Sequence, residues 1–178
     1  MPRQVNVDLI RDRIPVRYRV HPLIRGFMIL ISGAVCLYSV YFLIFHSRYD
    51  APFIFKLLPF IIFFVGGDSL LKHLLSLNSI TFWDEGLKFA YLAKKSLSVR
   101  YDQIVSMYLK RHVTYYLYLT YREADGSITT FRTKASFPRI LEIMTNIYDL
   151  VPGLDIPDEI TRKSCQFLAE QARLKQEQ

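Results

Sequence analysis

The sequence predicts an α+β membrane protein, in which a two-helix transmembrane hairpin precedes an antiparallel sheet that a C-terminal helix closes. Three observations predict this class. Two long apolar runs lie near the N-terminus, short alternating segments joined by tight turns follow them, and a helical apolar period comes last. The 178 residues therefore divide into a basic leader, a hairpin, a cytoplasmic domain and a helical tail, at 1–25, 26–75, 76–152 and 153–178.

The first apolar run contains no charged residue between positions 26 and 45. At about 1.5 Å per residue, a helix of this length spans about 30 Å, the hydrocarbon thickness of a bilayer. The second span is expected at 53–75 and carries Lys56, Asp68 and Lys72. Asp68 and Lys72 lie one helical turn apart on one face. They are either an interfacial pair or, with Lys56, polar residues inside the membrane that line a path.

Basic residues predict the orientation of the hairpin. The leader is rich in arginine, whereas the loop between the spans carries only Arg48. The positive-inside rule therefore places both termini in the cytoplasm and makes the chain a multi-pass protein. Most of the net charge of +7 is explained in this way. Nucleic-acid binding is not expected, because no basic stripe with interleaved aromatic residues is visible outside the leader.

The leader has two readings. Pro15 and Pro22 argue against one continuous helix through it. It is either a topology signal or a strand or arm that docks on the domain or on a partner. On the second reading its arginines are partner-binding candidates, namely Arg11, Arg13, Arg17 and Arg19, and Arg25 beside the bilayer is a lipid-contact candidate.

Short strands are expected from 79 to 133. Turn signals lie at 84–86, at 93–95 and at 123–126, where Asp125-Gly126 is typical of a tight hairpin turn. The segment TYYLYLTYR places Leu117 and Leu119 on one face of a strand and Tyr116 and Tyr118 on the other. Because exposed aromatic residues are enriched at protein interfaces, Tyr116 and Tyr118 are partner-binding candidates.

Two helices are expected after the strands. Apolar residues recur every three or four positions from 137 to 150, which predicts an amphipathic helix that caps the sheet. The tail carries a thin apolar stripe that includes Phe167 and Leu168. It is either a free, partly frayed helix or a docking helix for another subunit, with Phe167 and Leu168 as the contacts.

The order of these elements resembles that of the bacterial PH-like (pleckstrin-homology-like) membrane proteins. After the spans, ITFWDEGLKFAYL and SVRYDQIVSMYLKR are similar to that family's pattern of a strand, a glycine turn, a strand and an apolar-x-Tyr-x-Asp-Ile segment. Val99, Tyr101, Asp102 and Ile104 approximate the last segment, with Gln103 inserted. The resemblance implies a strongly bent antiparallel sheet closed by the helix at 137–150, in a protein of the bacterial inner membrane.

One departure from PH domains concerns lipid binding. Lipid-binding PH domains carry a basic cluster on the first hairpin, whereas the corresponding turn here is Asp84-Glu85-Gly86. Phosphoinositide binding at that turn is therefore not expected. Lys94 and Lys95, on the next turn, remain lipid-contact candidates.

No catalytic motif is visible. The sequence has no phosphate-binding glycine loop, no nucleophile elbow and no zinc-protease motif, and its histidines are scattered. Cys36 lies in the first span and Cys165 in the tail, so no disulfide or metal-ligand spacing is present. We therefore expect no catalytic, cofactor or metal site.

The resulting expectation is a non-enzymatic accessory or scaffold subunit of a larger inner-membrane complex. Its partners would be other subunits and the lipid bilayer, and a homo-oligomer stays open. Two alternatives also stay open: an anionic-lipid-responsive sensor and a small transport or channel subunit that uses the hairpin.

Overall fold

In the computed structural model, which describes residues 7–45 and 52–176 apart from the side chains of Phe55 and Lys56, the chain divides into two units. The hairpin unit comprises Arg19–Asn78 and Ala90–Lys95. The domain unit comprises the leader up to Tyr18, Ser79–Phe89 and the chain from Ser96 onwards. The leader up to Tyr18 and the tail thus belong to the same unit as most of the strands.

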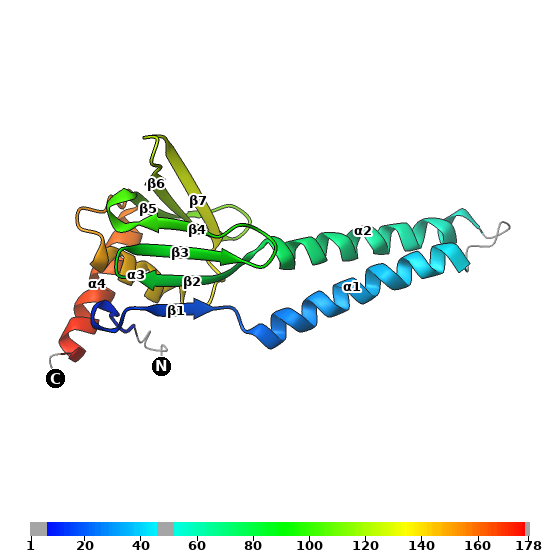
Figure 1. Cartoon of the computed structure of the whole chain (residues 1–178), viewed down its shortest axis with the longest axis horizontal. Helices are drawn as coiled ribbons and strands as arrows, with labels where there is room; N and C mark the ends of the chain where they lie inside the picture. Colours follow the sequence, from blue (N-terminus) through cyan, green and yellow to red (C-terminus); the bar gives the residue numbers. More distant parts are fainter. Residues whose placement is uncertain (1–6, 46–51, 177–178) are drawn as a thin grey trace. The chain divides into compact units, whose positions relative to one another are not determined.

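The hairpin unit is built from helix α1, Pro22–Phe45, and helix α2, Phe53–Leu75, which run side by side (Figure 1). Helix α2 has the expected bounds. Helix α1 begins before position 26, because proline is well tolerated at a first helical position. Ser32 Oγ lies 3.0 Å from Ser69 Oγ between the helices. By length and composition, Pro22–Phe45 and Leu57–Leu75 are sufficient to cross a bilayer.

Arg25 closes the helical hairpin. Its side chain is buried, and its guanidinium donates hydrogen bonds to the carbonyl oxygens of Ser76 and Leu77, at 2.7 and 2.9 Å, and to that of His73. A helix leaves its last carbonyl groups without intrahelical partners. Arg25 therefore caps the C-terminus of α2, and this side chain does not have the exposure expected of a lipid contact.

The strands form two sheets, where a single bent sheet was expected. The four-stranded sheet has the order β1-β2-β3-β4, and the three-stranded sheet has the order β5-β6-β7. The bounds are Val16–Arg19 (β1), Leu77–Trp83 (β2), Gly86–Tyr91 (β3), Leu97–Arg100 (β4), Ile104–Arg111 (β5), Tyr115–Arg122 (β6) and Ile128–Lys134 (β7). The pairs β3–β4, β5–β6 and β6–β7 are antiparallel. The leader supplies β1, which agrees with the strand reading of that segment.

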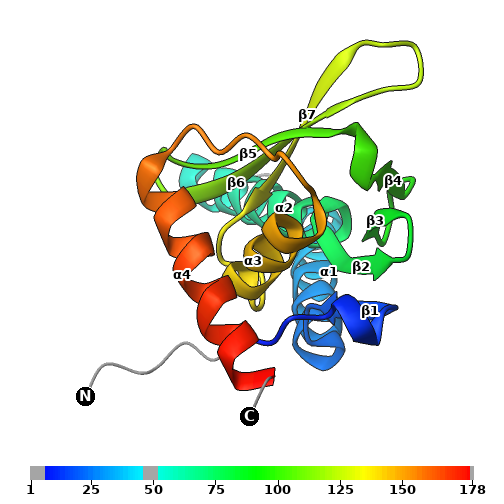
Figure 2. The same ribbon diagram turned by 90° about the vertical axis from the view of Figure 1, so that its left-hand side faces the viewer.

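The core of the domain unit lies between the sheets and helix α3, Ile140–Leu150. The ring centroids of Phe89 in β3 and Phe131 in β7 are 4.1 Å apart. Helix α3 adds Ile143, Met144 and Ile147, which are all fully buried. Figure 2 shows α3 enclosed between the three-stranded sheet and helix α4, Glu159–Gln176.

Helix α3 starts later than expected. The sequence predicts a start at 137, but Arg139 has a φ of 55°, in the left-handed region, and the helix begins only after it. A non-glycine residue with this conformation interrupts a right-handed helix. Phe137 is nevertheless buried. It lies in the core as the sequence pattern predicts, although it precedes the helix.

The tail is docked on the domain unit. Helix α4 buries one face beneath it, with the side chains of Thr161, Cys165, Ala169 and Ala172. Upstream of α4, the backbone of Asp155 accepts a hydrogen bond from Met107 N at 2.9 Å and donates one to Val105 O at 3.2 Å. The linker thus lies along one edge of β5, and the tail is not the free helix that the sequence allowed.

Gly86 provides a test of the β3–β4 pairing. A Cβ at this position would lie 2.2 Å from the Val99 carbonyl oxygen. We expect Gly86→Ala to lower the free energy of unfolding by about 1–3 kcal/mol, as overpacking does. Thermal unfolding of the full chain in mild detergent measures it. Gly33→Ala, where nothing beyond the neighbouring backbone of its own helix lies within 4 Å of the new Cβ, is the control. Equal melting temperatures for the two variants would contradict the close approach.

Candidate functional site

The three-stranded sheet presents one face to the core and one face outward. Leu117, Leu119 and Tyr121 of β6 are buried. Tyr116 and Tyr118 alternate with them and therefore point to the opposite side, where they are half-buried. The alternation expected for this strand is therefore present. Tyr115 is the exception, because it shares the face of Leu117 but is exposed at the first position of the strand.

The strand register assembles three rows of outward side chains. We call this surface the tyrosine face. Its rows across β5, β6 and β7 are Lys110–Tyr116–Lys134, Tyr108–Tyr118–Arg132 and Ser106–Thr120–Thr130. Arg122 continues the same face at the end of β6. The face is thus built from tyrosines, small hydroxyl residues and cations.

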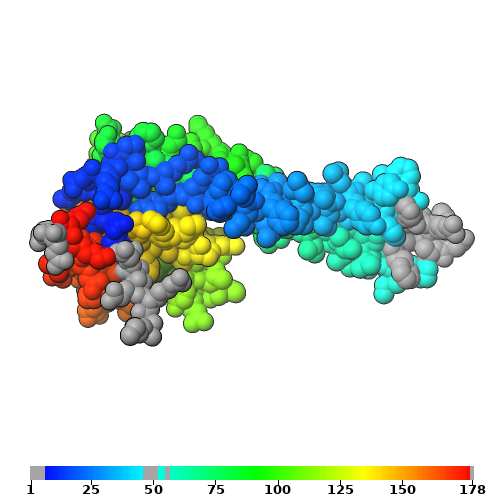
Figure 3. Space-filling view, turned by 90° about the horizontal axis from the view of Figure 1, so that it is seen from below, coloured from blue at the N-terminus to red at the C-terminus, as the bar shows by residue number. Residues whose placement is uncertain are grey.

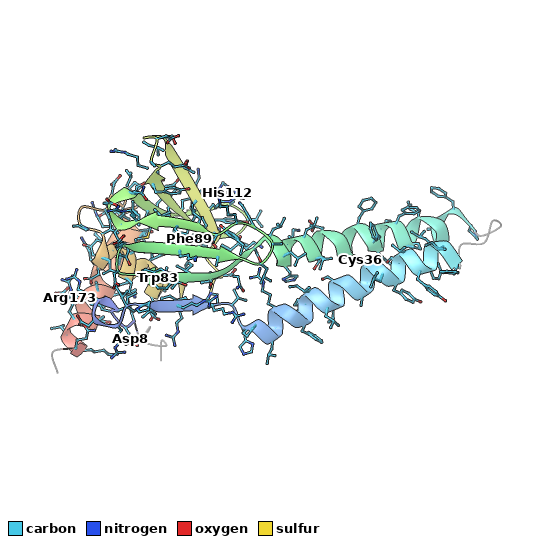
Figure 4. All side chains as sticks on the ribbon, in the orientation of Figure 1. Asp8, Cys36, Trp83, Phe89, His112 and Arg173 are labelled. Carbon is cyan, nitrogen blue, oxygen red and sulfur yellow. The ribbon has the colours of Figure 1, made fainter. Side chains whose placement is uncertain are left out.

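The tyrosine side chains hold one another in place. The rings of Tyr108 and Tyr118 stack with their centroids 5.0 Å apart and their planes 2° from parallel. The Tyr118 hydroxyl lies 2.9 Å from Nε2 of His112, in the β5–β6 turn (Figure 4). The Arg132 guanidinium lies 4.9 Å from the centroid of the Tyr116 ring, a cation–π contact. The surface therefore offers ring edges, hydroxyl groups and cations in fixed positions.

The charge on the tyrosine face is of one sign. Lys110, Arg122, Arg132 and Lys134 contribute positive charge, and no residue in the three rows is acidic. Such a surface attracts and orients acidic partners. No basic stripe with interleaved aromatic residues was expected outside the leader. That expectation was wrong, because the register brings the tyrosines and cations of three strands together.

The ring faces of the three tyrosines are partly covered by neighbouring side chains. Single-stranded nucleic acid binds aromatic side chains whose ring faces are free to stack on bases. On the tyrosine face, Tyr108 and Tyr118 stack on each other and Arg132 covers Tyr116. Carboxylates need only cations and hydroxyl donors, which this surface supplies.

The leader arginines have different environments. Arg11 donates to the carbonyl oxygen of Asp149 at 2.8 Å, and its Nε lies 3.5 Å from the Asp149 carboxylate. Arg173 of α4 pairs with the same carboxylate. Arg11 is thus engaged within the domain unit, although it is exposed, as are Arg13, Arg17 and Arg19.

The leader lies against α3 and α4. Oδ1 of Asn146 accepts a hydrogen bond from Ile10 N at 3.0 Å, and its Nδ2 donates to Asp8 O at 3.1 Å. Gln176 of α4 donates to Leu9 O at 3.2 Å. Figure 3 shows the leader and α4 side by side. The described part of the leader is therefore an arm, and it docks on helices α3 and α4 of the same chain.

A cleft between the leader and the start of α3 is lined by Asp8, Arg139 and Glu142. Glu142 is buried and accepts a hydrogen bond from the Tyr18 hydroxyl at 2.9 Å. Burial, together with Glu142, raises the pKa of Tyr18 well above its ordinary value, so the hydroxyl stays a donor. Glu142 is thus committed to a structural contact.

The lipid-contact candidates of the hairpin unit lie at one end of α2. Lys94 and Lys95 follow Ala93, whose N donates to the Leu74 carbonyl oxygen at 3.2 Å. Both lysines are exposed, and Lys94 Nζ lies 5.4 Å from the centroid of the Tyr91 ring. Asp68 and Lys72 form an exposed ion pair with each other. The side chain of Lys56 lies outside the described residues.

Other chemistry is sparse in the described ranges. Within 7–45 and 52–176, no group of three His, Cys, Asp or Glu side chains is arranged to hold a metal ion. Cys36 lies midway along α1 (Figure 4), and Cys165 is buried in α4. Burial raises the pKa of the Cys165 thiol to about 11, which makes it a weak nucleophile.

No protein-family model, curated protein or solved structure matches this chain. The fold and the site therefore define its class by themselves. It is an α+β protein with two long apolar helices, antiparallel sheets and C-terminal helices, and one of its sheets carries a basic tyrosine face.

Cys165 tests the docking of the tail. The rise of its pKa from 9.0 to about 11 leaves about a hundredfold less thiolate at neutral pH. In a Cys36→Ala background, we expect maleimide to react at least that much more slowly with the folded full chain than with the denatured chain at pH 7.5. The measurement is the rate of mass increase. Equal rates would show that α4 does not stay on the domain.

Proposed function

We propose that this chain is a non-enzymatic, PH-like module anchored in the bacterial inner membrane, and that it serves as an accessory or scaffold subunit of a larger membrane complex. Its cytoplasmic domain binds an acidic segment of a partner subunit through the tyrosine face. The observation that carries the proposal is the surface of stacked tyrosines and cations without an acidic residue.

The residue types support protein binding. Tyrosine and arginine are the residues most enriched among those that dominate interface energies. Here the Tyr108–Tyr118 stack, the His112 contact and the Arg132–Tyr116 contact fix the side chains before a partner arrives. Side chains that are already ordered lose less conformational entropy on binding, by about 0.5–1.5 kcal/mol each.

Charge complementarity identifies the partner segment as acidic. Lys110 and Lys134 lie on either side of Tyr116 in one row, and Arg132 lies in the next. A carboxylate placed over Tyr116 would meet cations on both sides and hydroxyl donors nearby. An uncharged segment would leave these cations partly desolvated without compensation.

The anchor and the orientation rest on the two apolar helices and on the leader arginines. Both helices have the length and composition of membrane spans. The PH-like assignment rests on the sequence resemblance, and the antiparallel sheets with the buried helix α3 are compatible with it.

A lipid-responsive role is the second candidate. The Ala93–Leu74 hydrogen bond holds the lysine turn at the C-terminal end of α2, where a spanning helix leaves the bilayer. Lys94 and Lys95 would then meet anionic headgroups, for about 1 kcal/mol each. The transport alternative gains no support, because Asp68 and Lys72 neutralise each other.

Photocrosslinking in native membranes tests the partner surface. We expect the full chain with benzoylphenylalanine at position 116 to form adducts with Asp- and Glu-rich peptides, which mass spectrometry identifies. Lys110→Glu/Lys134→Glu should reduce the adducts by about tenfold or more, because like charges now oppose the partner.

The matched control carries the same change in charge away from the tyrosine face. Lys88→Glu/Arg162→Glu should leave the adduct yield unchanged, because both residues are exposed on other elements. Adducts confined to lipid would favour the lipid-responsive role. Adducts confined to nucleic acid would contradict the proposal, because they would require the covered tyrosine rings to stack on bases. Equal loss in both double variants would show that only net charge matters.

Cysteine labelling tests the orientation. In a Cys36→Ala/Cys165→Ala background, a membrane-impermeant maleimide should label Ser47→Cys in intact cells, although position 47 lies outside the described residues. Lys95→Cys should react only after permeabilisation, because the positive-inside rule keeps that end in the cytoplasm. The reverse pattern would overturn the proposed topology.

A further inference from the structure

Helix α4 has an apolar stripe that the domain does not use. Ile160, Phe167 and Leu174 are 77%, 58% and 57% exposed. They recur every seven residues, so they follow one another along the helix with a drift of only about 20° per step. We call these three residues the α4 stripe. The residues that α4 buries against the domain lie on its opposite side.

The α4 stripe cannot be buried by rotation of the helix. Arg173 pairs with Asp149, whose side chain is only 3% exposed, and Gln176 donates to Leu9 O. Cys165 and Ala169 fill the contact with the domain. These contacts fix the rotation of α4 about its axis, and they present the stripe outward.

We propose that the α4 stripe binds α4 of a second copy of this chain in an antiparallel arrangement. The stripe is symmetric about Phe167, because Ile160 precedes it and Leu174 follows it by the same number of residues. A two-fold axis at Phe167 therefore sets Phe167 against the partner's Phe167 and Ile160 against the partner's Leu174. Such a self-complementary patch is what a two-fold interface requires.

The flanking charges select the antiparallel direction. At 100° per residue, Lys163 and Glu170 lie on the same side of the α4 stripe, on either side of Phe167 in sequence. Antiparallel pairing brings Lys163 beside the partner's Glu170, and this contact occurs twice. Parallel pairing would set Lys163 against the partner's other flank, which carries Ser164 and Gln171 and no acidic residue.

The contact is small. Three apolar side chains from each helix bury much less than the about 1,600 Å² of a standard interface. The pairing is therefore weak in free solution, and it gains strength when two copies are held close together in one membrane or complex. It is separate from the tyrosine face and does not depend on an acidic partner.

Cysteine crosslinking of the full chain tests the pairing and its direction. Every variant is made in the Cys36→Ala/Cys165→Ala background. Two populations, each with its own epitope tag, are reconstituted together in vesicles and treated with a short bis-maleimide. We expect Phe167→Cys to crosslink to itself. Ile160→Cys should crosslink to Leu174→Cys on the other tag but not to itself. Arg162→Cys, exposed on another side of α4, should not crosslink.

A charge exchange tests the flanking contacts. Lys163→Glu should reduce the Phe167→Cys crosslink by about fivefold or more, because it opposes the partner's Glu170. Lys163→Glu/Glu170→Lys should restore the crosslink. The intrahelical Glu159–Lys163 pair, at 2.7 Å, is lost in both variants, so restoration identifies the contact between copies.

Three results would each overturn the proposal. No crosslink at Phe167→Cys would exclude the second copy as the occupant. Self-crosslinking of Ile160→Cys at the yield of Phe167→Cys would establish parallel pairing. Failure of the double charge exchange to restore the crosslink would mean that Lys163 acts within its own helix. Far-UV circular dichroism of each variant checks that α4 remains folded.

Discussion

The docking of the leader by Asn146 is the contact on which the domain unit depends. Its amide is 1% exposed and bonds to the backbone of the leader on both sides, at Ile10 N and Asp8 O. A buried amide without partners would cost about 1–3 kcal/mol for each unpaired group. The leader is therefore part of the core, and Val7, Leu9 and Ile10 are buried with it. Downstream, the same segment supplies strand β1 and brings the Tyr18 hydroxyl to Glu142.

The features that sequence reasoning predicts well are local. The bounds of α2 and the hairpin turn at Gly126, with its φ of 85°, follow from apolar runs and turn chemistry within a few residues. Long-range polar contacts leave no such pattern. Arg25 caps carbonyl groups about fifty residues away, and Arg11 meets Asp149 across most of the chain. Since backbone carbonyl groups have no residue type, no motif marks them as acceptors. For this reason Arg25 was interpreted as a lipid contact, and the two readings of the leader could not be separated.

The tyrosine face was only half predictable. Alternation within β6 places Tyr116 and Tyr118 opposite Leu117 and Leu119, but each strand alone carries few cations. The Asp125-Gly126 turn does not supply the register of the neighbouring strand. A two-residue turn there would pair Arg122 with Thr129, whereas the structure pairs Arg122 with Ile128 and, further along, Tyr116 with Lys134. The position of Tyr108 beside Tyr118, across the β5–β6 connection, likewise required the structure.

One edge of the three-stranded sheet is already paired, which supports the proposed use of its face. A partner can extend a sheet only at an edge with free backbone groups. Along β5, the linker before α4 already pairs at Asp155 with Val105 and Met107. A partner strand therefore has no access to this part of the edge, while the side chains of the tyrosine face stay exposed. Recognition by side chains in fixed positions depends on charge and on the spacing between rows. The rigidity that comes from the docked leader and tail thus favours selectivity for an acidic segment over adaptable, sequence-independent strand addition.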